Sequence, residues 1–275
     1  YIEAIKEKHK PIVFNNADLH FLREIRAAVA AKDEELMDAA VITRGLELEV
    51  CRDVDAVLTY NTTEHAVIAS HNMHQDNLHV TPWVLDTKPP GPGFKERAGI
   101  AFLGGYNHKP NVEAVEFMVK QVMPKLLAVS PDITFYIYGS KMPEVFDEYA
   151  SENVVIKGFA ETLDGVYHDH RIFIAPLISG AGIKGKVLDA MAYATPTVLT
   201  DVAAEGTGLT NGLNTLIAND PQEWVEAIIK LYDDGKLWGR FAENSRLLAE
   251  ENFSFENGLK RFKKIFESVG VYSSK

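Results

Sequence analysis

Short apolar runs alternate with longer amphipathic stretches along most of the chain. After residue 97, runs of strand length predict strands at 100–103, 134–138, 154–156, 172–175, 197–200 and 215–217. Apolar residues at helical spacing predict helices between and after them, at 111–129, 143–151, 163–167, 185–193, 222–232, 236–251 and 255–269. Because strands that alternate with helices form parallel sheets covered on both faces, this part predicts a complete doubly wound α/β domain.

The first part of the chain has the same character but fewer strands. It predicts strands at 11–15, 56–60 and 78–81, two helices between Asp18 and Arg52 that break near Lys32, and a helix from Thr62. A parallel sheet this small is marginal alone, because its strands must be buried on both faces. The pattern therefore predicts a second Rossmann-like domain that is truncated.

Proline and glycine mark the boundary between the two parts. The stretch Asp86–Phe94 holds three prolines and two glycines, which cannot continue a helix or a central strand. This composition predicts two domains, over 1–90 and 97–275, joined by a linker at 91–96.

The composition is that of an ordinary globular protein, with 46% hydrophobic residues and a net charge of -11 over 275 residues. No basic excess is available to neutralise phosphates in bulk, so a nucleic-acid partner is not expected and any phosphate site must be local. The single cysteine, Cys51, excludes an internal disulfide and indicates a reducing, cytoplasmic location for a buried thiol. The chain begins at Tyr1 rather than at methionine, which predicts that an upstream part exists.

A Gly-rich stretch between the fourth and fifth strands predicted after residue 97 carries the candidate chemistry. Gly180 and Gly182 permit backbone angles closed to other residues, so the loop can turn its N–H groups toward a ligand at the helix start. Lys184 and Lys186 stand where the helix dipole already favours an anion, and Asp189 lies one turn further along. Two cations and a carboxylate in this place fit a ligand with phosphates at one end and hydroxyls nearby, such as a sugar nucleotide.

Two other interpretations of this loop stay open. Glycine, lysine and aspartate at a helix start are common in any α/β protein, so the stretch can be purely structural. The sequence from Gly180 to Gly185 also satisfies G-x-G-x-x-G, and Asp201 lies where a ribose-binding acid would lie in an NAD-dependent oxidoreductase. Against a dinucleotide site, Pro176–Ser179 separates the strand from the first glycine, where that fingerprint needs a tight turn.

An ordered set of motifs gives nearly the whole chain a resemblance to a known family. The motifs are Phe102–Val115, Phe135–Gly139, Val155–Gly158, Ala175–Leu177, Gly180–Lys186, Asp189–Ala192, Ala204–Gly206 and, in the first part, Asp18–Glu24. The set resembles retaining glycosyltransferases of the group 1 or family 4 type, and most closely modules of bacterial polysaccharide-assembly proteins. This resemblance implies the GT-B fold, with two Rossmann-like domains.

The resemblance also implies ligands and their contacts. A nucleotide-diphosphate sugar is expected as the donor in the C-terminal domain, and a glycan or lipid-linked acceptor is expected to enter from the N-terminal domain. Lys186, with Lys184 as second choice, would contact the diphosphate, and Asp189 would contact the ribose, because ammonium groups pair with phosphate oxygens and carboxylates accept from hydroxyls. The other donor-site candidates are Gly104, Gly105, Lys109, Gly158, Gly182 and Glu205.

Asp18 and His20 are the candidates on the acceptor side, as a pair that polarises a hydroxyl or handles a proton. The alternative is structural, with Asp18 as a helix cap and His20 as a surface histidine. Charge developing on the diphosphate needs cations and backbone donors, which the lysine loop can supply without metal or cofactor. Asp53 and Asp55 form an Asp-x-Asp pair but precede a strand, so capping is favoured over a metal site.

Departures from the family pattern leave one further alternative. The wider family has two glutamates separated by seven residues, whereas these positions here hold Ala181 and Asp189. Together with the incomplete first part of the chain, these two substitutions favour an alternative function. In this alternative the chain is a degenerate module that binds nucleotide sugar, while another part of the protein catalyses the transfer. A peripheral membrane contact through the missing N-terminal part is compatible with the resemblance.

Overall fold

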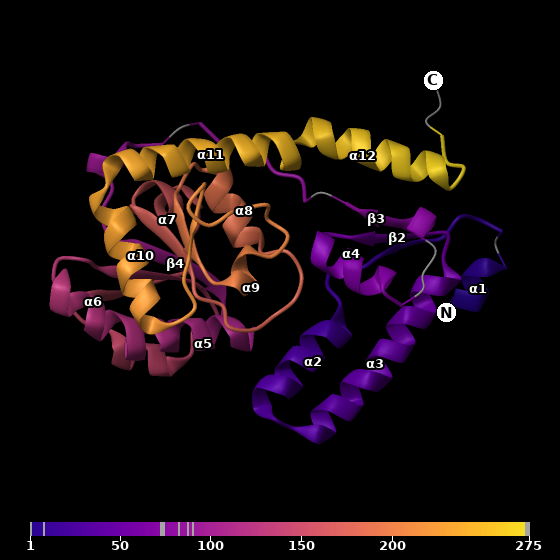
Figure 1. The fold of residues 1–275 in the computed structure, drawn as a ribbon, viewed down its shortest axis with the longest axis horizontal. Coiled ribbons are helices and arrows are strands. Elements are labelled where there is room, and N and C mark those ends of the chain that lie inside the picture. The colour runs from indigo at the N-terminus through magenta and orange to yellow at the C-terminus, as the bar shows by residue number, and fades with distance from the viewer. Residues whose placement is uncertain are drawn as a thin grey trace. The chain divides into compact units, whose positions relative to one another are not determined.

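The computed structural model describes residues 2–7, 9–71, 75–81, 83–86, 88–89 and 91–272. By their contacts these residues form two compact units, which are described separately. Unit 1 comprises Tyr1–Val84, Ser179–Ile183 and Asn252–Lys275, and unit 2 comprises Leu85–Ile178 and Lys184–Glu251. Figure 1 labels the α-helices of both units and some of their strands.

A six-stranded parallel sheet is the centre of unit 2 (Figure 1). Its strands lie in the order β6-β5-β4-β7-β8-β9, and every neighbouring pair is parallel. Their bounds are β4 Ile100–Gly105, β5 Phe135–Ser140, β6 Val154–Gly158, β7 Ile172–Ala175, β8 Thr197–Leu199 and β9 Leu216–Ile217. Each overlaps a predicted strand, so the prediction of a doubly wound parallel sheet is confirmed.

Helices connect these strands and continue after the last one. Their bounds are η2 Phe94–Glu96, α5 Lys109–Phe117, η3 Met118–Val122, α6 Met123–Val129, η4 Glu144–Tyr149, α7 Asp164–His168, α8 Gly185–Ala192, α9 Asp201–Ala204, α10 Pro221–Asp233 and α11 Gly235–Phe253. The helix predicted at 111–129 is interrupted by η3, a π-helical turn, and the one predicted at 143–151 is the 3-10 helix η4. The sequence pattern does not predict α9, because such a short helix shows no periodicity.

The strand order of unit 2 changes direction between β4 and β7. From β4 the chain builds outward through β5 and β6, then returns to place β7, β8 and β9 on the other side of β4. Because crossovers between parallel strands are right-handed, the helices of the two halves cover opposite faces of the sheet. The connections at the carboxyl ends of β4 and β7 therefore diverge around a crevice, which is where open α/β sheets bind ligands.

The core of unit 2 follows from the apolar character of its central strands. The side chains of 100–102 in β4 and of 172–175 in β7 are fully buried, as strands covered on both faces must be. Trp224 of α10, the largest of the fully buried side chains, packs into the same hydrophobic cluster. The helices thus exclude water from the sheet and leave only its carboxyl end for a site.

A buried arginine at the end of the linker forms hydrogen bonds within unit 2. Arg97 is 2% exposed, and its guanidinium donates to Pro92 O at 2.8 Å, Tyr167 O at 2.6 Å and Thr195 Oγ1 at 3.0 Å. Burial lowers the pKa of Arg97 to about 10, so the group stays charged at neutral pH. The predicted linker at 91–96 therefore ends in a fixed position against the sheet and contains the short helix η2.

Unit 1 contains a three-stranded parallel sheet in the order β1-β2-β3. Its elements are β1 Val13–Asn15, β2 Ala56–Thr59, β3 Leu78–Val80, α1 Ile2–Lys6, α2 His20–Ala31, α3 Glu34–Asp53, α4 Thr62–Ala69, η1 Gln75–Asn77 and α12 Phe255–Ser268. The predicted break near Lys32 is confirmed, because Lys32 has a φ of 54° and Asp33 caps α3 by accepting from two backbone N–H groups. The described sheet is as small as the sequence predicts.

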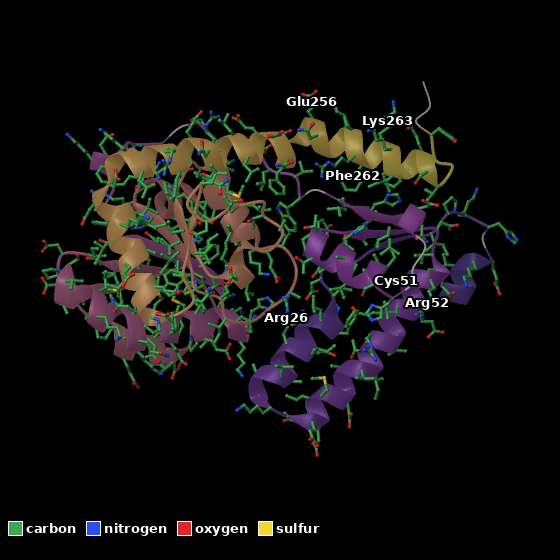
Figure 2. The ribbon with its side chains drawn as sticks, in the orientation of Figure 1. Arg26, Cys51, Arg52, Glu256, Phe262 and Lys263 are labelled. Atoms are coloured by element: carbon green, nitrogen blue, oxygen red, sulfur yellow. The ribbon has the colours of Figure 1, made fainter. Side chains whose placement is uncertain are left out.

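Cys51 lies on α3 and is buried, as predicted (Figure 2). It packs in the hydrophobic cluster of unit 1 with Leu48 and Val57. Burial raises the pKa of the Cys51 thiol to about 11, because the charged thiolate is poorly solvated there. The thiol therefore stays protonated at neutral pH and acts as a small apolar side chain.

Helix α12 belongs to unit 1 although it follows α11 directly in the sequence. The sequence pattern places it with the domain at 97–275, since the spacing of apolar residues does not say against which core a helix packs. Together with Ser179–Ile183, it makes unit 1 a composite of three separate stretches. No helix of the described residues is both long and apolar enough to cross a bilayer.

Candidate functional site

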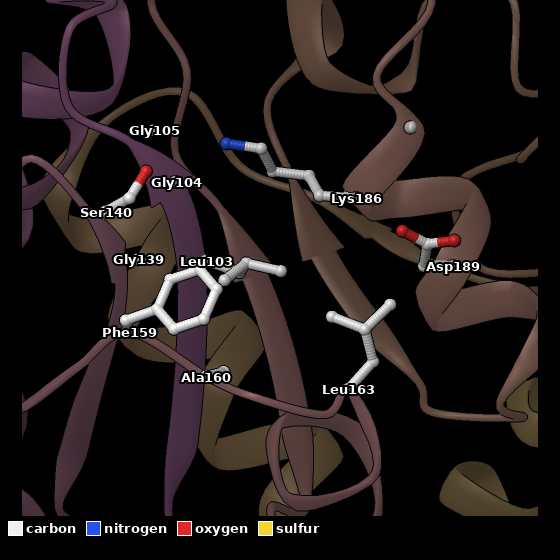
Figure 3. A pocket seen from close by; sticks show the side chains of 11 residues that line it. Leu103, Gly104, Gly105, Gly139, Ser140, Phe159, Ala160, Leu163, Lys186 and Asp189 are labelled. Atoms are coloured by element: carbon white, nitrogen blue, oxygen red, sulfur yellow. The ribbon is translucent and has the colours of Figure 1, made fainter.

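A cavity of about 350 Å³ lies at the carboxyl end of the sheet in unit 2 (Figure 3). The ends of β4 and β5, the segment after β6 and the start of α8 line it with Leu103, Gly104, Gly105, Gly139, Ser140, Phe159, Ala160, Leu163, Gly185, Lys186 and Asp189. This is the crevice at which the strand order changes direction. The fold therefore brings together four of the predicted donor-site residues, namely Gly104, Gly105, Lys186 and Asp189.

Lys186 extends from the first turn of α8 toward Gly105 (Figure 3). Its Nζ donates to Asn111 Oδ1 at 2.6 Å and lies 4.4 Å from the centroid of the Phe102 ring. Asn111 Nδ2 in turn donates to Gly105 O at 2.8 Å, which fixes the orientation of the amide. Asn111 therefore holds the Lys186 ammonium in place at the cavity.

Burial sets the charge behaviour of Lys186. It lowers the pKa of Lys186 to about 7, because the ammonium loses hydration and gains only a neutral amide and an aromatic ring. Among the residues that the structure describes, none forms an ion pair with it. An anion in the cavity would supply the missing countercharge and raise this pKa. Lys186 is thus suited to bind a phosphate group.

Asp189 lines the cavity one turn further along α8 (Figure 3). Burial raises the pKa of Asp189 to about 6, and the positive charge of Lys88 opposes the shift. The carboxylate is therefore mostly charged at neutral pH and can accept hydrogen bonds from two hydroxyls. One helix thus presents a cation and a carboxylate to the same cavity.

Two glycines are required by close packing under this cavity. A Cβ on Gly139 would lie 1.7 Å from Gly104 O, and Gly139 has a φ of +142°. A Cβ on Gly104 would lie 3.0 Å from Asn111 Cβ, so glycine lets Asn111 approach β4. The resemblance assigns Gly104 and Gly105 to phosphate contact, and the structure adds that Gly104 makes room for the side chain that holds Lys186.

Five other predicted donor-site residues do not line this cavity, namely Gly182, which is described below, and the four that follow. The side chain of Lys109 is 85% exposed and pairs with Glu113 at 3.2 Å. Gly158 ends β6 with a φ of 76°. Lys184 is buried as the N-cap residue of α8, and Glu205 follows α9 as its C-cap residue. Donor contacts by these four stay predictions.

The Gly-rich loop packs within unit 1. Gly182 N donates to Glu64 Oε1 at 2.7 Å, and Gly180 O accepts from Arg26 Nη1 at 2.8 Å (Arg26 is labelled in Figure 2). A Cβ on Gly182, whose φ is +74°, would lie 3.1 Å from Asp18 Cβ. The N–H that the sequence pattern directs toward a phosphate thus has a carboxylate acceptor in the structure.

Asp18 and His20 lie together at the start of α2. His20 Nδ1 lies 3.0 Å from Glu47 Oε1, and His20 Nε2 lies 3.9 Å from Asp18 Oδ1. Because an ionised carboxylate only accepts, Nδ1 is the donor in its contact with Glu47. Asp18 also accepts from Arg23. The His20 side chain is 54% exposed.

The N-terminus of α2 is capped from a neighbouring helix. Its N-cap residue, Leu19, makes no side-chain cap, and Glu47 of α3 accepts from His20 N at 3.1 Å and Phe21 N at 2.9 Å. A carboxylate is favoured here because the helix dipole is positive at this end. The alternative of Asp18 as the helix cap is therefore wrong, since local sequence does not reveal a cap supplied by another helix.

Asp53 and Asp55, for which a capping role or a turn was predicted, have other structural partners. Asp53 pairs with Lys6 Nζ at 3.2 Å, and Asp55 Oδ2 accepts from Ile12 N at 2.8 Å. Within the described ranges, no group of three or more His, Cys, Asp or Glu residues is arranged to hold a metal ion.

Asp201, the candidate ribose acid of the dinucleotide alternative, lies outside the cavity. It begins α9, and its Oδ2 accepts from Asn219 Nδ2 at 2.9 Å. The residues 176–184 separate β7 from α8, so the tight strand-to-helix turn of a dinucleotide fingerprint is not formed.

Several residues that line the cavity were not predicted from the sequence. Gly139 and Ser140 follow a buried strand at the same edge as Gly104, so the carboxyl-end rule could have found them. Phe159 and Leu163 come from the irregular segment after β6, where no periodic pattern marks them. Phe159 is 73% exposed at the cavity, and such an aromatic ring is a platform for a planar group such as a nucleobase.

Comparison with known proteins agrees with the resemblance in the sequence. A family model described as "Glycosyl transferases group 1" matches residues 97–234. The chain is 28% identical over 179 residues to an uncharacterized 44.6 kDa protein in the cps region of Klebsiella pneumoniae, covering 62% of this chain and 44% of that protein. It is 25% identical over 186 residues to an uncharacterized glycosyltransferase of Methanocaldococcus jannaschii, covering 64% of this chain and 46% of that protein. The chain thus spans less than half the length of these curated relatives.

Solved glycosyltransferase structures share the fold. HepE of Anabaena, in complex with UDP and glucose, has a TM-score of 0.69 at 13% identity and covers 98% of this chain and 74% of that chain. A mutant of S. aureus TarM, in complex with Fondaparinux, alpha-GlcNAc-glycerol and UDP, has a TM-score of 0.70 at 14% identity and covers 82% of this chain and 46% of that chain. The predicted GT-B fold class is confirmed.

Proposed function

Because this chain belongs to the group 1 glycosyl transferases, we propose that it binds a nucleotide-diphosphate sugar and moves the sugar to a glycan or lipid-linked acceptor in polysaccharide biosynthesis. The observation that carries the proposal is the Lys186 ammonium, held by Asn111 in a cavity at the switch point of the sheet without a countercharge among the described residues. The cps-region relative and the UDP bound by HepE and TarM support the donor class and the setting. The single buried Cys51 supports a cytoplasmic location.

Each side chain of the cavity has a proposed role toward the donor. Lys186 pairs with the diphosphate, and Asp189 accepts from the ribose hydroxyls. Phe159 offers its exposed face to the base. The glycines at the ends of β4 and β5 let the diphosphate approach the backbone closely.

In the proposed reaction, the bond between the anomeric carbon and the diphosphate oxygen breaks, and the electron pair leaves with the diphosphate. Lys186 stabilises the charge that develops on that oxygen, so neither a metal ion nor another cofactor is required. The acceptor hydroxyl attacks the anomeric carbon and loses its proton. We assign retention of configuration from the likeness to family 4, and proton NMR of the product's anomeric centre tests it.

Asp18 and His20 are proposed to act on the acceptor. Glu47 holds the proton of His20 on Nδ1, so Nε2 can accept a hydrogen bond from the acceptor hydroxyl and polarise it. Asp18 stabilises the ring when it takes up the proton. A lipid-linked acceptor would bring this surface to a membrane.

Calorimetric titration of the chain with UDP, GDP and NAD, followed by an assay for donor turnover, tests the proposal. Binding of a nucleoside diphosphate together with release of that diphosphate from a nucleotide sugar in the presence of acceptor is the expected result. Binding without turnover, also in the complete gene product, would favour the degenerate module. Binding of NAD alone would exclude the transferase.

Donor affinity is expected to follow a bell-shaped pH profile with limbs near pH 6 and pH 7. Lys186, whose lowered pKa is about 7, binds phosphate only when protonated, so affinity falls as pH rises through that value. Asp189, whose raised pKa is about 6, accepts from hydroxyls best when ionised, so affinity falls as pH drops through that value. The ligand for this titration is an intact nucleotide sugar, because its doubly esterified diphosphate does not titrate in this range.

The two limbs can be assigned separately with one variant. Asp189→Asn removes the titrating carboxyl and is expected to abolish the acid limb while leaving the alkaline limb in place. An acid limb that persists in this variant would mean that another group, not Asp189, controls binding there.

Phe159→Ala is expected to weaken nucleoside diphosphate binding by roughly 5- to 160-fold, which corresponds to about 1–3 kcal/mol for base stacking on an aromatic ring. Affinity for inorganic pyrophosphate should not change, because pyrophosphate has no base. Phe255→Ala, at a ring that is 66% exposed on α12 and does not line the cavity, is the matched control. Equal losses for both ligands would argue for a structural role of Phe159.

A further inference from the structure

A buried carboxylate stands at the first turn of α4. Glu64 is 1% exposed, and its own N–H donates to Asn61 Oδ1 at 2.8 Å, which caps the helix. The positive end of the helix dipole favours a carboxylate at this position. Burial of a charge nevertheless costs free energy unless hydrogen bonds compensate for it. The hydrogen-bond partners of Glu64 therefore indicate the role of this side chain.

One oxygen of Glu64 joins two segments that are far apart in the sequence. Glu64 Oε1 accepts from Gly182 N at 2.7 Å, across 118 residues, and from Leu19 N at 3.2 Å, across 45 residues. Gly182 belongs to the Gly-rich loop, and Leu19 stands between the two acceptor-side candidates, Asp18 and His20. One acceptor atom thus links the loop to the start of α2.

Two side chains of unit 1 hold backbone atoms of this loop. Residues 179–183 read Ser-Gly-Ala-Gly-Ile and contain no ionisable side chain. Gly180 and Gly182 have φ values of +124° and +74°, so the backbone is in regions that glycine enters freely and leaves freely. Arg26 donates to the carbonyl of Gly180 at 2.8 Å, and Glu64 accepts from the amide of Gly182, so each side chain anchors one residue of the loop.

We propose that Glu64 is a positioning residue that holds the Gly-rich loop against the segment carrying Asp18 and His20. Its role in turnover rests on the proposed function, because only a transferase needs these groups in one arrangement. The contact needs an acceptor oxygen at the reach of Glu64 Oε1, so glutamine, which keeps that oxygen, should replace Glu64 and a shorter acid should not.

Amide hydrogen exchange at single residues tests the contact directly. Glu64→Ala is expected to speed exchange at both Gly182 and Leu19 by at least about tenfold, since each loses its buried acceptor. Glu64→Gln should keep both amides protected. Glu64→Asp keeps the carboxylate but shortens the side chain by one methylene, so exchange at the Gly182 amide should become faster. This variant serves as the test if Glu64→Ala does not fold.

Glu47→Ala is the matched control for exchange. It removes another carboxylate that holds the start of α2, and it should speed exchange at His20 and Phe21 while leaving Gly182 protected. Unchanged exchange at Gly182 in both Glu64→Ala and Glu64→Asp would overturn the proposal, as would a glutamine variant that exchanges like the alanine variant.

Turnover separates positioning from general stability. Glu64→Ala and Glu64→Asp are expected to lower kcat by at least about tenfold, with recovery in Glu64→Gln and with UDP affinity at the unit 2 cavity unchanged within about twofold. A kcat that stays at the wild-type value while Gly182 is exposed would refute the role in turnover. Amide exchange is measured without any substrate. If the transferase proposal is wrong, the unmodified chain will show no turnover, but the exchange result for Gly182 and Leu19 will still test the Glu64 contact.

Discussion

Lys186→Ala is expected to weaken nucleoside diphosphate binding by roughly 30- to 160-fold, because it removes a charge-assisted contact worth about 2–3 kcal/mol. The loss should be specific to ligands with a diphosphate, since the base and ribose contacts remain. Calorimetric titration with UDP and with uridine measures it. Thermal unfolding should not fall at neutral pH, because the lowered pKa of Lys186 shows that the buried ammonium is unfavourable in the empty site.

Lys120→Ala is the control for a general loss of positive charge. Lys120 is 56% exposed and pairs with Glu116 at 3.3 Å on the π-helical turn, away from the cavity lining. Its substitution should change UDP affinity by less than about twofold, as expected for an exposed ion pair. Comparable losses in both variants would show that net charge, and not the site at α8, governs binding.

Gly139→Ala is expected to destabilise the protein by at least about 4 kcal/mol, a severe effect for one methyl group. A Cβ at this position would lie 1.7 Å from Gly104 O, and Gly104 and Gly139 are paired in the central strands β4 and β5. The strands would have to move apart, or the chain at 139 would have to leave its φ of +142°. The midpoint of urea unfolding measures the change.

Gly212→Ala separates steric overlap from backbone strain. Gly212 also has a positive φ, +76°, but nothing lies within 4 Å of the position of its Cβ. The left-handed conformation alone should cost about 1–2 kcal/mol in a residue with a side chain. If Gly139→Ala loses no more stability than Gly212→Ala, close packing of β5 on β4 is not what requires glycine there.

The architecture of unit 2 was largely predictable because its signals are local. Buried parallel strands are continuous apolar runs, as at 172–175, and the helices between them repeat apolar residues at helical spacing. Lys186 and Asp189 were predictable for the same reason, since one helix turn fixes their spacing and the helix start favours an anion.

The partners of the site residues were not predictable, because they arise from contacts between segments. Nothing local to Asn111 indicates that it will meet Lys186, and nothing local to Glu47 indicates that it will cap α2. Phe159 stands in an irregular segment, so its exposure at the cavity depends on where β6 ends. Periodicity identifies which face of an element is buried but does not identify what covers it.

The chain re-enters unit 1 twice and unit 2 once, and this limits how the protein can be divided into fragments. A recombinant piece ending at residue 84 would lack both the Gly-rich loop and α12, and a piece covering 85–251 would carry that loop without Glu64 or Arg26 to hold it. Neither half can therefore be obtained intact by a single cut. Fragment complementation, in which separately produced pieces reassemble, would need α12 to be supplied together with the N-terminal piece.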